Sequence, residues 1–165
     1  MPIKLVLADD DREPIPVFIA VGTDQIARIY LGDDESGLIY SAIACLSPLT
    51  GYNGLHAFEL VFFLQQCAPD GTELHAFKDG ALTKPLLPTP ESRGIVFAAI
   101  LTCIIGLIDK IRPSLCHMYT EVPNQPEQSL RKFHRIVTIF RDYGYNCSED
   151  GPLYGRYIWR METSE

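Results

Sequence analysis

Three side chains in apolar, strand-like sequence carry groups suited to general acid–base catalysis. His117 and Glu121 lie in SLCHMYTEV (114–122) and share one face of the predicted strand, because side chains alternate along a strand. At ~3.3 Å per residue they stand about 13 Å apart, so each alone, rather than the pair, is a candidate base for a substrate amine. Glu59, inside HAFELVFFL, is either solvent-facing or functional. Purely structural roles are the alternative for all three.

Carboxylates are concentrated near the start of the chain, where the first fifty residues hold eight Asp and Glu against three Lys and Arg. Seven of these acids form two clusters, Asp9, Asp10, Asp11 and Glu13, and Asp33, Asp34 and Glu35. Both clusters flank apolar runs, as solvated loops do. The functional alternatives are a divalent-cation site and a docking surface for a basic partner. Neither cluster has the Asp-x-Asp-x-Asp-Gly pattern of a calcium loop, so we predict no metal site.

The composition argues against several classes of protein. The 165 residues are 47% hydrophobic, and 14 Lys and Arg against 21 Asp and Glu give a net charge of −7, which disfavours binding to nucleic acid or to an anionic membrane. The longest uncharged apolar stretch, 94–108, is shorter than the ~18–20 residues that cross a bilayer. One basic set, Arg131, Lys132, Arg135 and Arg141, is interpreted as a solvated helix face.

The cysteines and the first residues of the chain indicate a reducing compartment. The five cysteines, at 45, 67, 103, 116 and 147, form no Cys-x-x-Cys pair and no zinc-type spacing. The opening MPIKLVLADDD is typical of neither a signal peptide nor a transit peptide. We therefore expect reduced thiols and a cytoplasmic protein.

Hydrophobic periodicity and turn residues predict a single α+β domain over residues 1–165. The predicted strands are 3–8, 16–22, 25–32, 37–46, 56–66, 73–78, 114–122 and 153–162, although the region 25–46 fits either strand or helix. The predicted helices are 93–111, with Ser92 as N-cap, and 126–143, with Gly144 just after its end. We expect a mixed, mainly antiparallel sheet of about six or seven strands with both helices packed on it.

This order of elements resembles the GNAT-type N-acetyltransferases and, more closely, GNAT-like proteins of phages. The resemblance rests on the stretch PESRG (90–94) before the long helix, the strand LCHMYTEV and the segment FHRIVTIFRDYGYN (133–146). It implies a GNAT-like fold and acetyl-CoA as cofactor. Of the family's diphosphate-binding loop, [QR]-x-x-G-x-[GA], this chain matches Arg93 and Gly94. The resemblance further implies Glu59 or Glu121 as the base and Tyr143 as the acid.

The chain departs from the family at that loop. Gly94 is followed by Ile95, Val96 and Phe97, three bulky residues where the family brings its backbone close to the diphosphate. We therefore predict a non-catalytic, acidic protein-binding inhibitor of the immunity or anti-defence type on a GNAT-like scaffold, with no cofactor. Its partner would be a basic protein captured by the two acid clusters. The alternative function is a CoA-dependent N-acetyltransferase.

Overall fold

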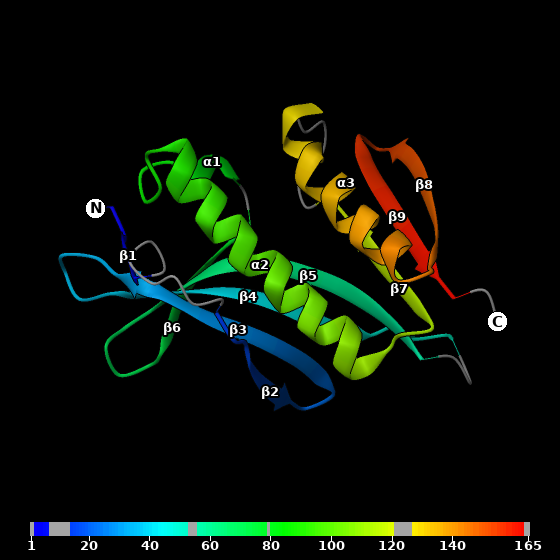
Figure 1. Cartoon of the computed structure of the whole chain (residues 1–165), viewed down its shortest axis with the longest axis horizontal. Helices are drawn as coiled ribbons and strands as arrows, with labels where there is room; N and C mark the ends of the chain where they lie inside the picture. The colour runs from blue at the N-terminus through cyan, green and yellow to red at the C-terminus, as the bar shows by residue number, and fades with distance from the viewer. Residues whose placement is uncertain (1, 7–13, 53–55, 79, 121–126, 164–165) are drawn as a thin grey trace.

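A computed structural model describes the chain except for residues 1, 7–13, 53–55, 79, 121–126 and 164–165. The described residues form two layers, a twisted sheet and two main helices that lie across one of its faces (Figure 1). The strands are β1 (Lys4–Leu5), β2 (Val17–Val21), β3 (Asp24–Asp33), β4 (Ile39–Pro48), β5 (Ala57–Cys67), β6 (Glu73–Phe77), β7 (Leu115–Tyr119), β8 (Asn146–Leu153) and β9 (Arg156–Glu162). The helices are α1 (Gly80–Thr83), α2 (Pro90–Ile111) and α3 (Glu127–Asp142).

The sheet confirms the predicted α+β class and its mixed, mainly antiparallel character. Its path is β1-β3-β4-β5-β7-β9-β8, with β2 also paired to β3 and β6 also paired to β5. Among the pairings of the described strands, that of β5 with β7 is the parallel one.

The expected number of strands is wrong, because the described chain forms nine rather than about six or seven. The strand β8, with the sequence NCSEDGPL, is almost entirely exposed and therefore lacks the apolar alternation that marks a strand. It pairs with β9 as an antiparallel hairpin at the end of the sheet, so tertiary pairing rather than pattern creates it.

The ambiguous region 25–46 is a β-hairpin of β3 and β4. Six of the ten residues of β4 are buried, including five consecutive ones, so its sequence shows no clear period of two. At the bulge in β3, Gly32 has a φ of +149°, and a Cβ there would overlap the carbonyl of Lys4 in β1. Glycine at this position allows the close approach of β1.

The helix α2 begins before the predicted residue 93, and its N-cap is Thr89 rather than Ser92. The Thr89 Oγ1 accepts from the Ser92 N–H at 3.0 Å, and the Ser92 Oγ lies 3.2 Å from the Thr89 N–H, which completes a capping box. Pro90 suits the first turn, where no backbone donor is needed. Because Ser92 and Thr89 can both cap, the sequence alone places the start three residues too late.

By length and composition alone α2 could cross a membrane. In this fold its apolar side chains pack on the sheet, and eight of them are buried, namely Val96, Ala99, Ile100, Leu101, Cys103, Ile104, Leu107 and Ile108. The helix α3 buries one stripe, formed by Leu130, Phe133, Ile136, Val137 and Phe140. It ends as predicted, with Gly144 at φ +90° just beyond it.

The parallel strands β5 and β7 stay paired over a short distance. Their register joins Ala57–Glu59 to Leu115–His117, after which β5 pairs with β6 from Leu64 onward. Residues 60–63 of β5 therefore pair with no described strand on that edge. The two helices cover this divergence from one side (Figure 1).

Candidate functional site

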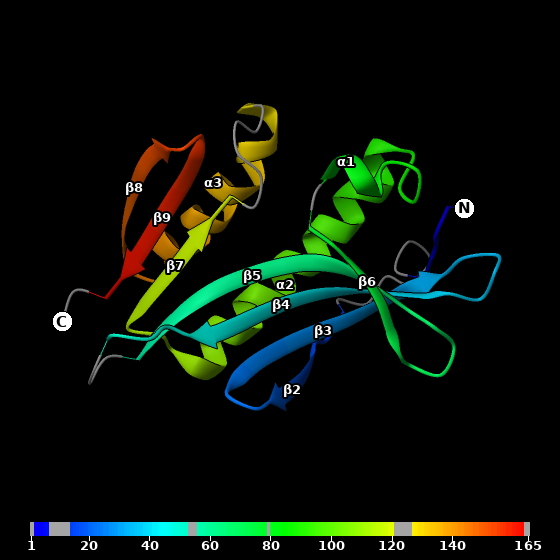
Figure 2. The same cartoon turned by 180° about the vertical axis from the view of Figure 1, so that it is seen from behind.

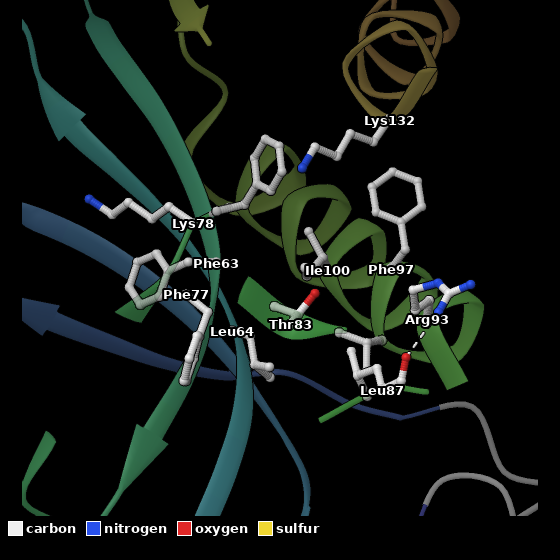
Figure 3. Close-up of a pocket in the computed structure, with 12 residues that line it drawn as sticks. Phe63, Leu64, Phe77, Lys78, Thr83, Leu87, Arg93, Phe97, Ile100 and Lys132 are labelled. Atoms are coloured by element: carbon white, nitrogen blue, oxygen red, sulfur yellow. Dashed lines mark hydrogen bonds between the residues drawn. The ribbon is translucent and has the colours of Figure 1, made fainter. Parts of the chain in front are cut away.

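An apolar cavity of about 210 Å³ lies beside the diverging part of β5 (Figure 3). Residues from β5, β6, α2 and α3 and from the segments between them line it: Phe62, Phe63, Leu64, Phe77, Lys78, Thr83, Leu87, Arg93, Val96, Phe97, Ile100 and Lys132. On α2, the spacing of 93, 96, 97 and 100 directs these side chains to one face of the helix. The cavity thus lies where one face of α2 meets the edge of β5.

Three cationic side chains line this cavity, and no Asp or Glu is among its described lining residues. The Arg93 Nη1 donates to the Leu87 carbonyl at 3.0 Å, which holds the guanidinium at the rim. The Lys132 Nζ lies 5.8 Å from the centre of the Phe62 ring, and the Lys78 Nζ lies 5.7 Å from that of Phe63. Arg93 and Lys132 bring positive charge to the helix side of this cavity, whereas the Lys78 side chain extends to the other side of β5, beside Phe63 (Figure 3).

An apolar interior with a cationic rim favours ligands that have an apolar body and an anionic group. Hydrocarbon is transferred from water into the interior, and the anion pairs with Arg93 or Lys132. The uncharged hydroxyl among the lining residues belongs to Thr83, and no Cys, His, Asp or Glu lines the described cavity. The arrangement suits binding better than covalent chemistry.

Stacked aromatic rings fill the space next to the cavity. The Phe62 and Phe133 ring centres are 5.4 Å apart, and Phe133 stacks on Trp159 at 4.8 Å with an interplanar angle of 7°. Trp159 also stacks on Tyr157, at 6.0 Å. This row connects β5 through α3 to β9, and its Phe62 end lines the cavity.

The residues at the start of α2 do not fit the diphosphate of a coenzyme A. Pro90 has no N–H, the Ser92 N–H is taken by Thr89, and Glu91 adds a negative charge in the first turn. Gly94 has open space around its Cβ position, so nothing in its described surroundings requires a glycine. Of the two residues that the resemblance implied for the cofactor, Arg93 lines the apolar cavity and Gly94 does not.

Glu59 lies on the opposite face of the sheet from the cavity. Its neighbours Phe58 and Leu60 join the core under the helices, so alternation directs Glu59 away from them. It is the direct neighbour of His117 on β7, and His117 is in turn opposite Arg160 on β9. The three side chains form a polar row across the sheet.

The surroundings of His117 disfavour the charged form of its imidazole. Burial lowers the pKa of His117, and Arg160 lowers it further, against the opposing effects of Glu162 and Glu59. The His117 Nε2 and the Arg160 Nε are both buried and have no hydrogen-bond partner among the described residues. The ring of Tyr52 lies edge-on to that of His117 at 5.7 Å.

Tyr143, another predicted catalytic residue, is brought neither to this row nor to the cavity. Tyr143 follows the end of α3, with its ring 5.5 Å from the Arg112 Cζ, at the opposite end of α2 from the cavity. Burial and a hydrogen bond with Asp109 raise its pKa. Glu121 lies outside the described residues.

The second acid cluster is divided by the fold. Asp34 is only 8% exposed, and its carboxylate accepts from the Ser36 N–H, the Ser36 Oγ, the Leu38 N–H and the Tyr40 hydroxyl at 2.9, 2.6, 3.2 and 2.8 Å. Asp33 accepts from the Tyr30 hydroxyl at 2.5 Å. Asp33 and Glu35 remain exposed at the turn between β3 and β4. The first cluster, Asp9, Asp10, Asp11 and Glu13, lies outside the described residues.

Sequence reasoning missed the cavity because its cations come from separate segments of the chain. Lys78 follows β6, Arg93 lies on α2 and Lys132 lies on α3. Lys132 was interpreted as part of a solvated helix face, whereas it lines the cavity beside Phe62. The stretch around 84–97 carried a partial signal, since it combines Arg93 with aliphatic and aromatic residues.

Comparison of the chain with known proteins adds no relative to this description. No protein-family model, curated protein or solved structure matches it. No group of three or more His, Cys, Asp or Glu side chains in the described part of the chain is placed to hold a metal ion.

Proposed function

We propose that this domain binds a small anionic ligand with an apolar body in the cavity between β5, β6, α2 and α3. The main support is the apolar cavity, whose lining includes Lys78, Arg93 and Lys132 and no described carboxylate. The whole chain, in contrast, has a net charge of −7. Burying the apolar part supplies affinity, and the cations supply selectivity for an anionic head.

The volume sets the size of this ligand. Drug-sized ligands occupy pockets of roughly 300–1,000 Å³, whereas this cavity measures about 210 Å³. A short acyl chain or a single aromatic ring with a carboxylate or phosphate ester suits it.

We propose a GNAT-like scaffold for the same domain. The order of β5, α2, β7, α3 and a closing strand pair supports it, because the resemblance implied a long helix, a strand, a second helix and a final strand. A CoA-dependent N-acetyltransferase is the enzymatic form of this proposal, and the Glu59–His117 pair favours it. The start of α2 favours ligands other than a diphosphate.

Calorimetric titration of the full chain with octanoate, octanamide and acetyl-CoA tests the proposal. Octanoate should bind, and the uncharged octanamide should bind about tenfold more weakly or worse, because a charge-assisted pair is lost. Substitution Arg93→Gln or Lys132→Gln should weaken octanoate binding, whereas Arg131→Gln, a neighbouring exposed cation on α3 that does not line the cavity, should not.

Equal affinity for octanoate and octanamide, or no binding of either, would overturn the ligand proposal. Acetyl-CoA that binds more tightly than octanoate, with turnover of an amine acceptor, would favour the acetyltransferase instead. Loss of that turnover in Glu59→Gln would then assign the base.

A second candidate function is capture of a basic protein partner as a non-catalytic inhibitor. It is favoured by the turn between β3 and β4, where the buried network of Asp34 holds the exposed Asp33 and Glu35 in a fixed arrangement. Such a partner, recovered by affinity capture, should dissociate as salt rises. Double substitution of Asp33→Asn and Glu35→Gln should weaken capture without unfolding the domain, and unchanged capture would exclude this turn.

A further inference from the structure

A further cation, Arg135 of α3, lies beside the apolar cavity. Its guanidinium Cζ is 5.4 Å from the centre of the Phe97 ring, and Phe97 lines the cavity. Figure 1 and Figure 2 show from both sides that α2 and α3 run beside each other over one face of the sheet. Because Phe97 belongs to α2, the contact of Arg135 with this ring spans the two helices.

Helix geometry brings Arg135 together with Arg93 and Lys132. Arg93 and Phe97 are four residues apart on α2, and Lys132 and Arg135 are three apart on α3, so each pair shares one helix face. Figure 3 shows Arg93, Phe97 and Lys132 on the helix side of the cavity, where the Lys132 Nζ lies 5.8 Å from the centre of the Phe62 ring. We call Arg93, Lys132 and Arg135 the cation cluster.

The described surroundings of the cation cluster supply little negative charge. No Asp or Glu lines the described cavity, and none of the ion pairs between described residues includes Arg93 or Arg135. Glu91 is two residues from Arg93, which is about 200° around the helix and therefore on another face. Like charges held on neighbouring helices repel each other, so an anion between them is stabilised by the whole cluster.

The number of cations distinguishes between anionic groups of a ligand. A carboxylate carries one negative charge and two oxygens, which a single guanidinium can bind by itself. A phosphate monoester carries nearly two negative charges above about pH 7 and has three terminal oxygens, so it can accept from several cations at once. The planar fork of each arginine matches the spacing of phosphate oxygens.

We propose that the ligand of this cavity is a phosphate monoester, with its apolar body in the cavity and its phosphate bound by the cation cluster. This inference rests on the proposed function, because it names the anionic group of the same ligand. Arg93 and Lys132 serve any anionic group, and Arg135 adds selectivity for a second negative charge.

Calorimetric titration of the full chain at about pH 8 with octyl phosphate, octyl sulfate and octanoate tests this inference. The three ligands share a linear alkyl chain, and octyl sulfate has the shape of the phosphate with a single negative charge. Octyl phosphate should bind about tenfold more tightly than either of the others, because it pairs with more of the cation cluster. Inorganic phosphate alone should bind more weakly than octyl phosphate, since it leaves the apolar cavity unfilled.

The variant Arg135→Gln tests the place of the phosphate. It should reduce the advantage of octyl phosphate over octyl sulfate to about twofold or less. Arg141→Gln is the matched control, because Arg141 is an exposed cation of the same helix that lines a different cavity, beside Glu149 of β8. It removes the same charge from the chain and should leave the advantage unchanged. Circular dichroism should show both variants folded.

The outcomes separate this inference from the function on which it rests. Octanoate that binds as tightly as octyl phosphate would overturn the phosphate monoester and leave an anionic ligand in the cavity. A phosphate advantage that persists in Arg135→Gln, or that falls equally in Arg141→Gln, would overturn the assignment to the cation cluster. Inorganic phosphate that binds as tightly as octyl phosphate would do the same for the cavity. Binding of none of these ligands would overturn the proposed function and, with it, this inference.

Discussion

Glu59 on β5 and His117 on β7 are direct neighbours in the parallel register, and both side chains lie on the sheet face opposite the apolar cavity. A carboxyl group beside an imidazole is a common acid–base arrangement. The ligand-sized cavity and this pair therefore approach the divergence of β5 and β7 from opposite sides. A substrate bound in the cavity would have to reach this pair between the two strands.

The first prediction concerns the titration of His117. Because the Arg160 charge lowers the pKa of His117 and the Glu59 charge raises it, Arg160→Gln should raise this pKa and Glu59→Gln should lower it. An NMR titration of the His117 ring resonances measures both shifts. Shifts of the same sign in the two variants would contradict the placement of His117 between these charges.

The second prediction concerns Asp34. Its carboxylate accepts four hydrogen bonds in the turn that joins β3 to β4, and Asn would replace one acceptor oxygen by a donor group. Asp34→Asn should lower the free energy of unfolding by about 1–3 kcal/mol. Urea unfolding checks this, with Glu35→Gln as the exposed neighbour expected to stay within about 0.5 kcal/mol of the wild type.

The third prediction gives the pH dependence of the same contribution. The hydrogen bond from Ser36 is the main cause that holds the pKa of Asp34 below 3.8. Because the folded-state pKa lies below the unfolded one, the stabilisation is present above the unfolded pKa and is lost as pH falls through the folded pKa. The stability difference between wild type and Asp34→Asn should therefore narrow as the pH falls from 7 to below that pKa. A constant difference would contradict a charged Asp34.

The fourth prediction separates two glycines. Gly94→Ala should stabilise the protein by about 0.5–1 kcal/mol, because the residue lies within α2 and a Cβ there meets no atom within 4 Å. Gly32→Ala should destabilise it by at least about 1–3 kcal/mol, because of its positive φ and the Lys4 carbonyl. Thermal unfolding measures both.

Gly94→Ala also tests whether acetyl-CoA, the cofactor that the resemblance implied, binds at the start of α2. If Gly94 served a close backbone approach to a diphosphate, Gly94→Ala would abolish acetyl-CoA binding while raising stability. Unchanged octanoate binding in Gly94→Ala is the outcome expected from the cavity, which Gly94 does not line.

Local patterns in the sequence were sufficient for the fold class and for most elements. Proline, glycine and capping residues act on their own neighbourhood, so α2, α3 and the strands β2, β5, β6 and β7 lie close to their predicted ranges, whereas the choice between strand and helix over 25–46 stayed open. The failures occurred where local patterns conflicted or were absent. The sequence predicts Ser92 as the cap of α2, whereas Thr89 caps it, and the exposed β8 is a strand because β9 pairs with it.

The candidate sites depended on tertiary structure. The cations at 78, 93 and 132 line one cavity only when β6, α2 and α3 are packed together, and no spacing in the sequence encodes this arrangement. Asp33, Asp34 and Glu35 are equally acidic in the sequence, yet the hairpin buries Asp34 and leaves its neighbours exposed, because a carboxylate leaves water only when nearby donors replace its hydration. Likewise, the sequence determined that Glu59 alternates with apolar residues, and the layer of helices on one side decided which face it occupies.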